Sequence, residues 1–178
     1  MRLNRRHFLR ATGALMISGD AKRAGAYSST GSSRRLGFEC THTGDFLDVE
    51  YWADGRYVPE SMAAIDHVLR DFRTGEVHPI DLNLLDLLHS LRSNLDSREP
   101  FHVISGYRSP ATNGALRSKS GGVATKSLHM RGMAIDIRLP GRDITDVHRA
   151  SLELRAGGVG YYPTLDFVHV DVGRVRRW

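Results

Sequence analysis

The sequence contains a single cysteine, Cys40, among its 178 residues. One cysteine excludes an intramolecular disulfide, so the fold relies on its hydrophobic core even if the protein works in an oxidising compartment. A lone cysteine in a predicted strand is more often a small buried side chain than a nucleophile. We therefore expect Cys40 to be structural, and the chemistry to lie elsewhere.

The sequence also lacks a hydrophobic run long enough to cross a membrane. The weakly apolar stretch at residues 11–19 is far shorter than the ~20 residues of a membrane-spanning helix. It follows the pair Arg5-Arg6 and precedes a small-x-small motif that ends at Ala26. This arrangement predicts a twin-arginine signal peptide at residues 1–26, export to the periplasm, and no stable membrane insertion after cleavage. The alternative is a basic amphipathic helix at the N-terminus.

The predicted mature chain has no excess of charge of either sign. The whole sequence has 25 Lys and Arg residues and 20 Asp and Glu residues, but residues 1–26 hold six of the basic residues and one of the acidic ones. The remainder therefore has 19 of each and is formally neutral. The sequence pI of 9.7 mainly reflects the signal. We accordingly predict no nucleic-acid partner.

After a Ser- and Gly-rich linker at residues 27–35, residues 36–178 are long enough for a single core and contain no internal repeat. A monomer is the default expectation. Hydrophobic periodicity and turn residues predict strands near 36–41, 46–52, 101–105, 133–139 and 165–172, and helices near 59–72, 82–95, 110–118 and 144–155. Asp81 is expected to cap the second of these helices, and the glycine-rich segment at 157–160 is expected to break the chain after the last one. This order predicts an α+β fold with helices packed on a small, mainly antiparallel sheet.

Two histidines and one aspartate stand out as candidate metal ligands. His129 lies at the entry to the predicted strand 133–139, Asp136 lies within it, and His169 lies on the last predicted strand. Two imidazoles and one carboxylate are a common ligand set for a catalytic zinc, which keeps a fourth position for water. Zinc brings the pKa of such a water close to neutral and makes it a nucleophile. The sequence therefore predicts a metal-dependent hydrolase, provided that the two strands are neighbours.

Two further carboxylates flank His169. Asp166 precedes it by three residues, and Asp171 follows it by two, on the same face of a strand. We favour Asp166 as the general base that activates water, and Asp171 as a carboxylate that orients a ligand histidine or a substrate amine. The reverse assignment stays open, and in that case Asp166 only shapes a turn.

Arg108 is the candidate electrophilic helper. It follows a predicted strand, within a turn upstream of the ligands. A guanidinium can donate two hydrogen bonds to the negative charge of a tetrahedral intermediate or to a substrate carboxylate. Outside this context, Arg108 would read as an ordinary surface arginine in a turn.

Four motifs resemble those of the M15 zinc peptidases, in particular the branch called DUF882 with its MepK-type murein endopeptidases. They are Ser105-Gly106-Tyr107-Arg108-Ser109-Pro110, Ser127-x-His129-x-x-Gly132-x-Ala134-x-Asp136, Gly157-Gly158-Val159-Gly160-Tyr161-Tyr162 and Phe167-Val168-His169-Val170-Asp171. The resemblance covers roughly residues 36–178 and implies the M15 (hedgehog/D,D-peptidase-like) fold.

The resemblance implies a zinc held by His129, Asp136 and His169, and a role for Arg108 in stabilising the oxyanion. Its substrates would be peptidoglycan stem peptides, and the expected reaction is hydrolysis of cross-links, particularly the L,D type between two diaminopimelate residues. The alternatives are a D,D-carboxypeptidase or dipeptidase, or a non-catalytic peptidoglycan-binding zinc module. One departure concerns the base, because many M15 enzymes carry Glu where this chain has Asp166.

Overall fold

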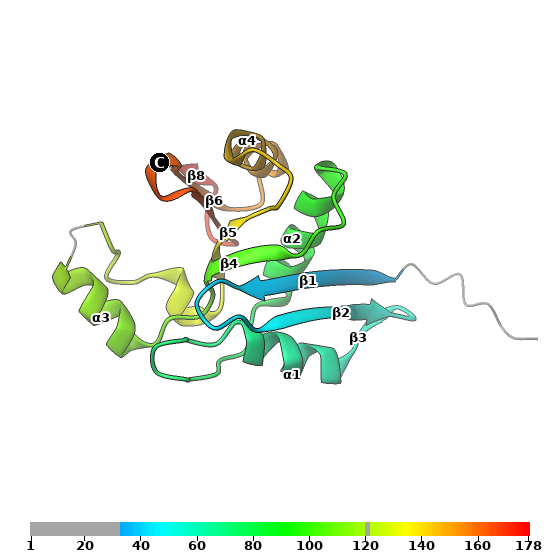
Figure 1. The fold of residues 1–178 in the computed structure, drawn as a ribbon, viewed down its shortest axis with the longest axis horizontal. Coiled ribbons are helices and arrows are strands. Elements are labelled where there is room, and N and C mark those ends of the chain that lie inside the picture. The colour runs from blue at the N-terminus through cyan, green and yellow to red at the C-terminus, as the bar shows by residue number, and fades with distance from the viewer. Residues whose placement is uncertain (1–32, 120–121) are drawn as a thin grey trace, which may run out of the picture.

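The computed structural model describes residues 33–119 and 122–178. In these residues the chain forms one eight-stranded sheet, four α-helices and two short 3-10 helices (Figure 1). The elements are, in order, β1 (Arg34–Cys40), β2 (Phe46–Ala53), β3 (Arg56–Tyr57), α1 (Pro59–Val68), α2 (Leu82–Asn94), β4 (Phe101–Ser105), α3 (Pro110–Lys119), η1 (Leu128–Arg131), β5 (Ala134–Arg138), α4 (Ile144–Leu154), β6 (Gly158–Tyr162), η2 (Pro163–Leu165), β7 (Phe167–Asp171) and β8 (Arg176–Arg177).

The sheet has the strand order β3-β2-β1-β4-β5-β7-β6-β8. The β1–β4 and β6–β8 pairs are parallel, and the other pairings are antiparallel. The predicted α+β class with a mainly antiparallel sheet is therefore confirmed, although the sheet is mixed and has more strands than the sequence patterns indicated.

The strand β6 was expected only as a glycine-rich break after a helix. It pairs with β7 in register, with Gly160 opposite His169. The glycines permit this close approach, since a Cβ at Gly157 would lie 1.7 Å from the backbone oxygen of Asp171. A Cβ at Gly160 would lie 2.7 Å from the ring of Trp178. The glycines thus allow close packing around this strand, whereas their low strand propensity predicts a break in the chain.

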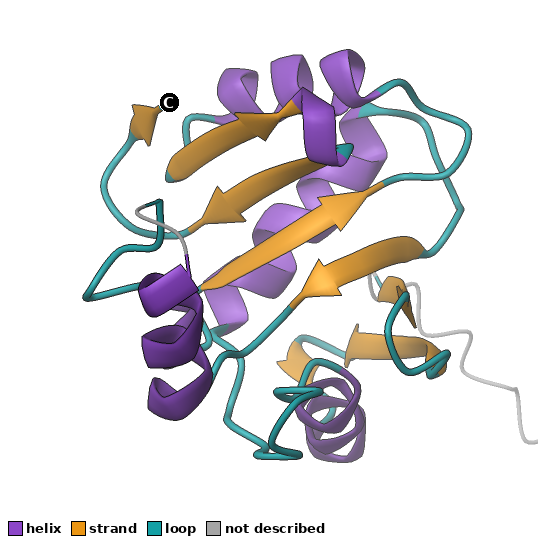
Figure 2. Cartoon of the chain, turned by 60° about the vertical axis from the view of Figure 1, so that its left-hand side comes forward, coloured by secondary structure: helices purple, strands orange, loops and turns teal. Residues whose placement is uncertain are grey.

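The helices α2 and α4 pack against each other and cover one face of the sheet (Figure 2). The core lies in this layer, where alternate residues of the strands meet the leucines of α2. In β5, for example, Ile135 and Ile137 are fully buried in the core. Since side chains alternate along a strand, Asp136 between them points to the opposite face.

The helix predicted at 59–72 ends at Val68. The backbone N–H of Tyr107 donates to the carbonyl oxygen of Leu69 at 2.8 Å, and the carboxylate of Asp71 accepts the N–H groups of Arg73 and Ser109. These contacts take the chain out of the helix, and most of them join residues far apart in sequence. By contrast, the predicted cap of the next helix is confirmed, since Asp81 accepts the N–H of Asn83 at 2.8 Å.

The strand β1 begins at Arg34, so the last two residues of the predicted linker belong to the sheet. The Arg34 side chain donates to Asp86 on α2 at 2.7 Å, which ties this end of the strand to a helix. The predicted signal at residues 1–26 and residues 27–32 of the predicted linker lie outside the described residues, and both stay predictions.

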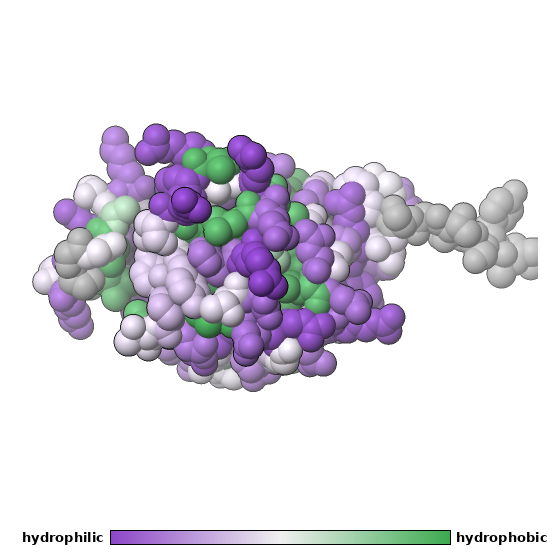
Figure 3. Space-filling model, turned by 90° about the horizontal axis from the view of Figure 1, so that it is seen from above, coloured by the Kyte–Doolittle hydropathy of each residue, from purple (hydrophilic) through white to green (hydrophobic). Residues whose placement is uncertain are grey.

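Among residues 33–119 and 122–178, no helix is long and apolar enough to span a membrane. The face of the molecule in Figure 3 is mostly hydrophilic, and its hydrophobic residues form small separate patches.

Candidate metal centre

The strands β5 and β7 are neighbours, as the candidate ligand set requires. They pair antiparallel, and Asp136 lies directly opposite His169. Residues that face each other across two strands point to the same side of the sheet. This register brings a carboxylate and an imidazole together on the face that is not covered by α2 and α4.

His129 reaches the same place from η1, the turn that precedes β5. Gly132 ends this turn in the left-handed region, with φ 64°. A Cβ at Gly132 would lie 2.2 Å from the carbonyl oxygen of Pro79, so only glycine lets the chain pass here. The N–H of Met133 then donates to the carbonyl oxygen of Leu128 at 3.1 Å and closes the turn.

The three candidate ligand atoms converge. Nε2 of His129 lies 3.2 Å from Nδ1 of His169 and 3.2 Å from Oδ1 of Asp136. Nδ1 of His169 lies 2.8 Å from Oδ1 of Asp136. All three side chains are buried. In a tetrahedral zinc site with bonds of about 2.0–2.1 Å, ligand atoms lie roughly 3.3–3.4 Å apart. Slight opening of this triangle would therefore match a metal ion.

The outer nitrogen of each imidazole is already engaged. Nδ1 of His129 lies 2.7 Å from the carbonyl oxygen of Gly106, and Nε2 of His169 lies 3.1 Å from Oδ2 of Asp171. Since these oxygens only accept, the outer nitrogens donate, and a lone pair on each ring faces the cluster. Two nitrogen lone pairs and a carboxylate oxygen within 3.2 Å of one another repel unless a cation lies among them.

The pKa values of these groups follow from the same contacts. Burial lowers the pKa of His129. Burial alone would raise the pKa of Asp136, but His129, His169 and Arg108 outweigh it and hold this pKa well below its usual range. Burial also opposes a charge on His169, yet hydrogen bonds to Asp136 and Asp171 raise its pKa. The cluster thus attracts positive charge, either a proton or a metal ion.

Arg108 lies at the cluster. Its Nη2 group donates to Oδ2 of Asp136, and its Nε donates to the hydroxyl of Ser105 at 2.7 Å. A register shift between Val103 and Ser105 places Ser105 opposite Asp136, as a β-bulge does when it re-aims a side chain. The Nη1 group of Arg108 has no protein acceptor in the part of the chain that the structure describes.

Asp171 is fully buried behind His169. Besides His169, its carboxylate accepts from the N–H groups of Gly158 at 3.0 Å and Gly173 at 2.8 Å. The guanidinium of Arg176 donates to both of its oxygens, at 3.1 and 2.6 Å. Burial would raise the pKa of Asp171, but these donors hold it well below its usual range. Asp171 therefore orients His169 and does not itself line the cavity described below.

The structure does not bring Asp166 to the cluster. Asp166 is the left-handed residue that ends η2, with φ 54°. Its side chain is 60% exposed and pairs with Nη1 of Arg138 at 3.2 Å. It is absent from the residues that line the cavity over the cluster. This geometry gives no support to the expected role of Asp166 as the base, and favours the alternative in which it shapes a turn.

A cavity of about 600 Å³ opens over the three candidate ligands. The described side chains on its walls include three groups that the sequence patterns did not single out. They are the basic residues Arg73, Lys126 and Arg176, the aromatic residues Tyr162, Phe167 and Trp178, and the histidine His42. Tyr162 and Phe167 fall within motifs noted for their neighbours, and Arg176 belongs to a short basic run at the C-terminus that indicates at most a local anion contact. No local signal marks the other residues.

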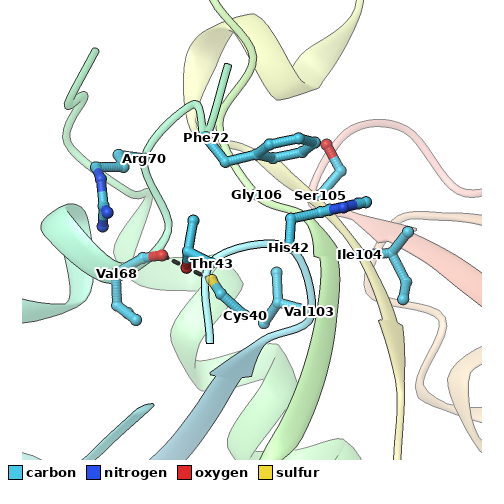
Figure 4. Close-up of a pocket in the computed structure, with 10 residues that line it drawn as sticks. All are labelled: Cys40, His42, Thr43, Val68, Arg70, Phe72, Val103, Ile104, Ser105 and Gly106. Carbon is cyan, nitrogen blue, oxygen red and sulfur yellow. Dashed lines mark hydrogen bonds between the residues drawn. The ribbon is translucent and has the colours of Figure 1, made fainter. Parts of the chain in front are cut away.

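Cys40 lines a small pocket that shares His42, Ile104 and Ser105 with the walls of the cavity (Figure 4). Its Sγ donates to the carbonyl oxygen of Val68 at 2.9 Å, and burial raises its pKa. A thiol with a raised pKa is a poor nucleophile. These observations agree with the structural role expected for this cysteine.

Comparison with known proteins gives concordant results. A family model described as peptidoglycan L,D-endopeptidase MepK matches residues 28–178. The chain is 44% identical over 151 residues to the peptidoglycan L,D-endopeptidase MepK of Escherichia coli (strain K12). The aligned region covers 84% of this chain and 82% of the relative. It is also 42% identical over 154 residues to the probable peptidoglycan L,D-endopeptidase MepK of Haemophilus influenzae. This second aligned region covers 86% of this chain and 83% of that relative.

Proposed function

We propose that this chain is a zinc-dependent endopeptidase that hydrolyses peptide cross-links in peptidoglycan. The chain belongs to the M15 peptidase family, which includes the peptidoglycan L,D-endopeptidase MepK. The bond we assign to it is the L,D cross-link between two diaminopimelate residues. The observation that carries the proposal is the convergence of two imidazoles and one carboxylate beneath a cavity of about 600 Å³.

The donor set is suited to zinc. His129, Asp136 and His169 would hold it through two nitrogens and one oxygen, and the ion would supply Lewis acidity and an activated water. The outer contacts to Gly106 and Asp171 hold both imidazoles in the tautomer that this binding requires.

We assign the oxyanion contact to Arg108. Its Nη2 and Nε groups are held by Asp136 and Ser105, so the guanidinium has a fixed orientation at the edge of the cluster. The Nη1 group is left to donate to the negative charge that develops on the carbonyl oxygen of the scissile bond. Asp171 acts through His169, and Asp166 shapes the turn before β7.

Digestion of purified sacculi tests the function. The zinc-loaded protein should release muropeptides whose masses report cleavage of diaminopimelate–diaminopimelate cross-links, and His129→Ala should release none. Loss of only a terminal D-alanine would instead identify a D,D-carboxypeptidase. Binding to sacculi without any product from the zinc-loaded protein would point to a non-catalytic module and overturn the proposal.

We also propose that the protein acts in the periplasm and arrives there by the twin-arginine route. The support is the pair Arg5-Arg6 before a weakly apolar stretch, together with a substrate that lies outside the inner membrane. Replacing both arginines by lysine should leave the precursor in the cytoplasm, which fractionation and immunoblotting would detect. Normal periplasmic amounts of that variant would remove the twin-arginine assignment without affecting the proposed chemistry.

A further inference from the structure

The cavity carries more positive charge than the chain as a whole. Four Arg or Lys side chains line it, whereas Asp136 supplies the only carboxylate among its described lining residues. Basic and acidic residues are equal in number over residues 27–178. The local excess therefore does not follow from composition, and it favours a ligand with negative charge.

Two of the four cations already have carboxylate partners. Arg108 donates to Asp136, and Arg176 donates to Asp171. The side chains of the other two, Arg73 and Lys126, have no hydrogen bond or ion pair to an acceptor within residues 33–119 and 122–178. These two are available to an anionic ligand.

Of the two, Arg73 is held in place by its surroundings. Its guanidinium carbon lies 4.0 Å from the centre of the Phe72 ring, which is a favourable cation–π contact. The Phe72 ring in turn stacks on His42, with ring centres 4.0 Å apart and an angle of 17° between the planes (Figure 4). Arg73 and His42 both line the cavity. The stack therefore presents a largely preformed guanidinium to a ligand, which reduces the entropic cost of binding.

The backbone at Arg73 is tied to the turn that carries Arg108. Asp71 is buried, and its Oδ1 accepts the N–H of Arg73 at 2.9 Å while its Oδ2 accepts the N–H of Ser109 at 2.8 Å. Burial would raise the pKa of Asp71, but hydrogen bonds from Thr112, Ser109 and Arg73 lower it to about 2. A single ionised carboxylate thus fixes the two segments that bear cavity arginines relative to each other.

The two arginines also interact electrostatically. Arg73 is exposed at the cavity, so its desolvation is partial; this desolvation lowers its pKa, Asp71 raises it, and the charge of Arg108 lowers it again. Both guanidinium groups line the same cavity, and two like charges placed in this way bind a shared or adjacent anion more tightly than either would alone. A carboxylate is a fitting partner, because its two oxygens match the fork of a guanidinium.

We infer that Arg73 is a specificity-determining residue that binds a free carboxylate of the substrate next to the scissile bond. The inference rests on the proposed function. Each diaminopimelate residue has a second carboxyl group on its side chain, and this group is the acidic chemistry that Arg73 would recognise. Asp71 is the positioning residue, because it holds Arg73 and the turn of Arg108 in fixed positions relative to each other.

The test compares two purified cross-linked muropeptides that differ only in whether the diaminopimelate carboxyl groups are free or amidated. Wild type should have a lower KM for the free acid. With that substrate, Arg73→Ala should raise KM on the order of 10- to 100-fold and change kcat by less than about threefold, since a hydrogen-bonded charge pair is lost from binding. With the amidated substrate, the same variant should resemble wild type.

Arg98→Ala is the matched control, because Arg98 is exposed and precedes β4 at the end of that strand opposite the site. Arg73→Lys should restore only part of the KM, since an ammonium lacks the guanidinium fork. An equal rise of KM with both substrates, or no preference of wild type for the free acid, would overturn the inference. The preference of wild type for the free acid over the amidated substrate is measured without a variant, so this test stands even if Arg73→Ala fails to fold. Cleavage of neither substrate by wild type would instead refute the proposed function.

Discussion

The two carboxylates that flank His169 have opposite environments. Asp171 on β7 is fully buried and accepts from His169, Arg176 and two backbone N–H groups. The side chain of Asp166, in the turn before β7, is 60% exposed, and within residues 33–119 and 122–178 its carboxylate pairs with Arg138 alone. A buried carboxylate is tolerated only when donors satisfy it, whereas an exposed one is satisfied by water.

The difference shows that closeness in sequence to a ligand is a weak guide to a catalytic role. The strand period of two places Asp171 on the face of His169 whatever the rest of the fold does. No such period governs Asp166, because the left-handed backbone at the end of η2 turns its side chain toward Arg138. The substitutions below test this contrast between the buried site and the turn.

The largest effect should come from the buried site. His129→Ala or His169→Ala should remove bound zinc and reduce the release of muropeptides to the level of a blank, because two ligands hold a metal far more weakly than three. Metal analysis after gel filtration and the sacculus assay measure both effects. His148→Ala is the control, since His148 stacks on Tyr161 and lies outside the cluster. Full zinc content in the ligand variants would show that the ion binds elsewhere.

Arg108→Ala should lower kcat by about 10²–10³-fold, the usual cost of losing an oxyanion donor. Zinc content should stay close to one ion per chain, because the three candidate ligands remain. Kinetics on a cross-linked muropeptide provide the measurement. Arg138→Ala serves as the arginine control, because Arg138 ends β5 and pairs with Asp166 outside the cluster. If KM rises and kcat is unchanged, Arg108 binds the ground state of the substrate and does not stabilise the oxyanion.

Asp171→Asn should weaken zinc affinity or activity by about 10–100-fold, as is typical when the partner of a ligand histidine is altered. The amide can no longer hold His169 as a carboxylate does, and the guanidinium of Arg176 loses its counter-charge. Competition with a zinc chelator separates affinity from turnover. An inactive variant that keeps full zinc affinity would make Asp171 a candidate for the base.

Asp166→Asn should have the smallest effect, with kcat within about threefold of wild type, because asparagine also adopts the left-handed conformation and only an exposed ion pair is lost. Steady-state kinetics on the same muropeptide check this. A fall in kcat of about 10²–10⁴-fold with zinc retained is the signature of a general base. That result would identify the exposed Asp166 as a catalytic residue.

Several features follow from the sequence alone because they depend on neighbouring residues. The strand at 101–105, the helix at 144–154 and the cap at Asp81 match the structure closely, since alternation, helical period and capping act over a few residues. The same holds for the candidate ligands. Alternation along β5 and β7 already placed Asp136 and His169 each on a defined face of its strand.

Other features were decided only by tertiary structure. The strand β6 forms because its glycines let it approach β7 and Trp178, and the first helix ends early because Leu69 and Asp71 bind residues nearly forty positions away. The position of Arg73 in the cavity depends on the same contacts. Hydrogen bonds and close packing between distant segments have no local periodicity, so no pattern of neighbouring residues could have predicted them.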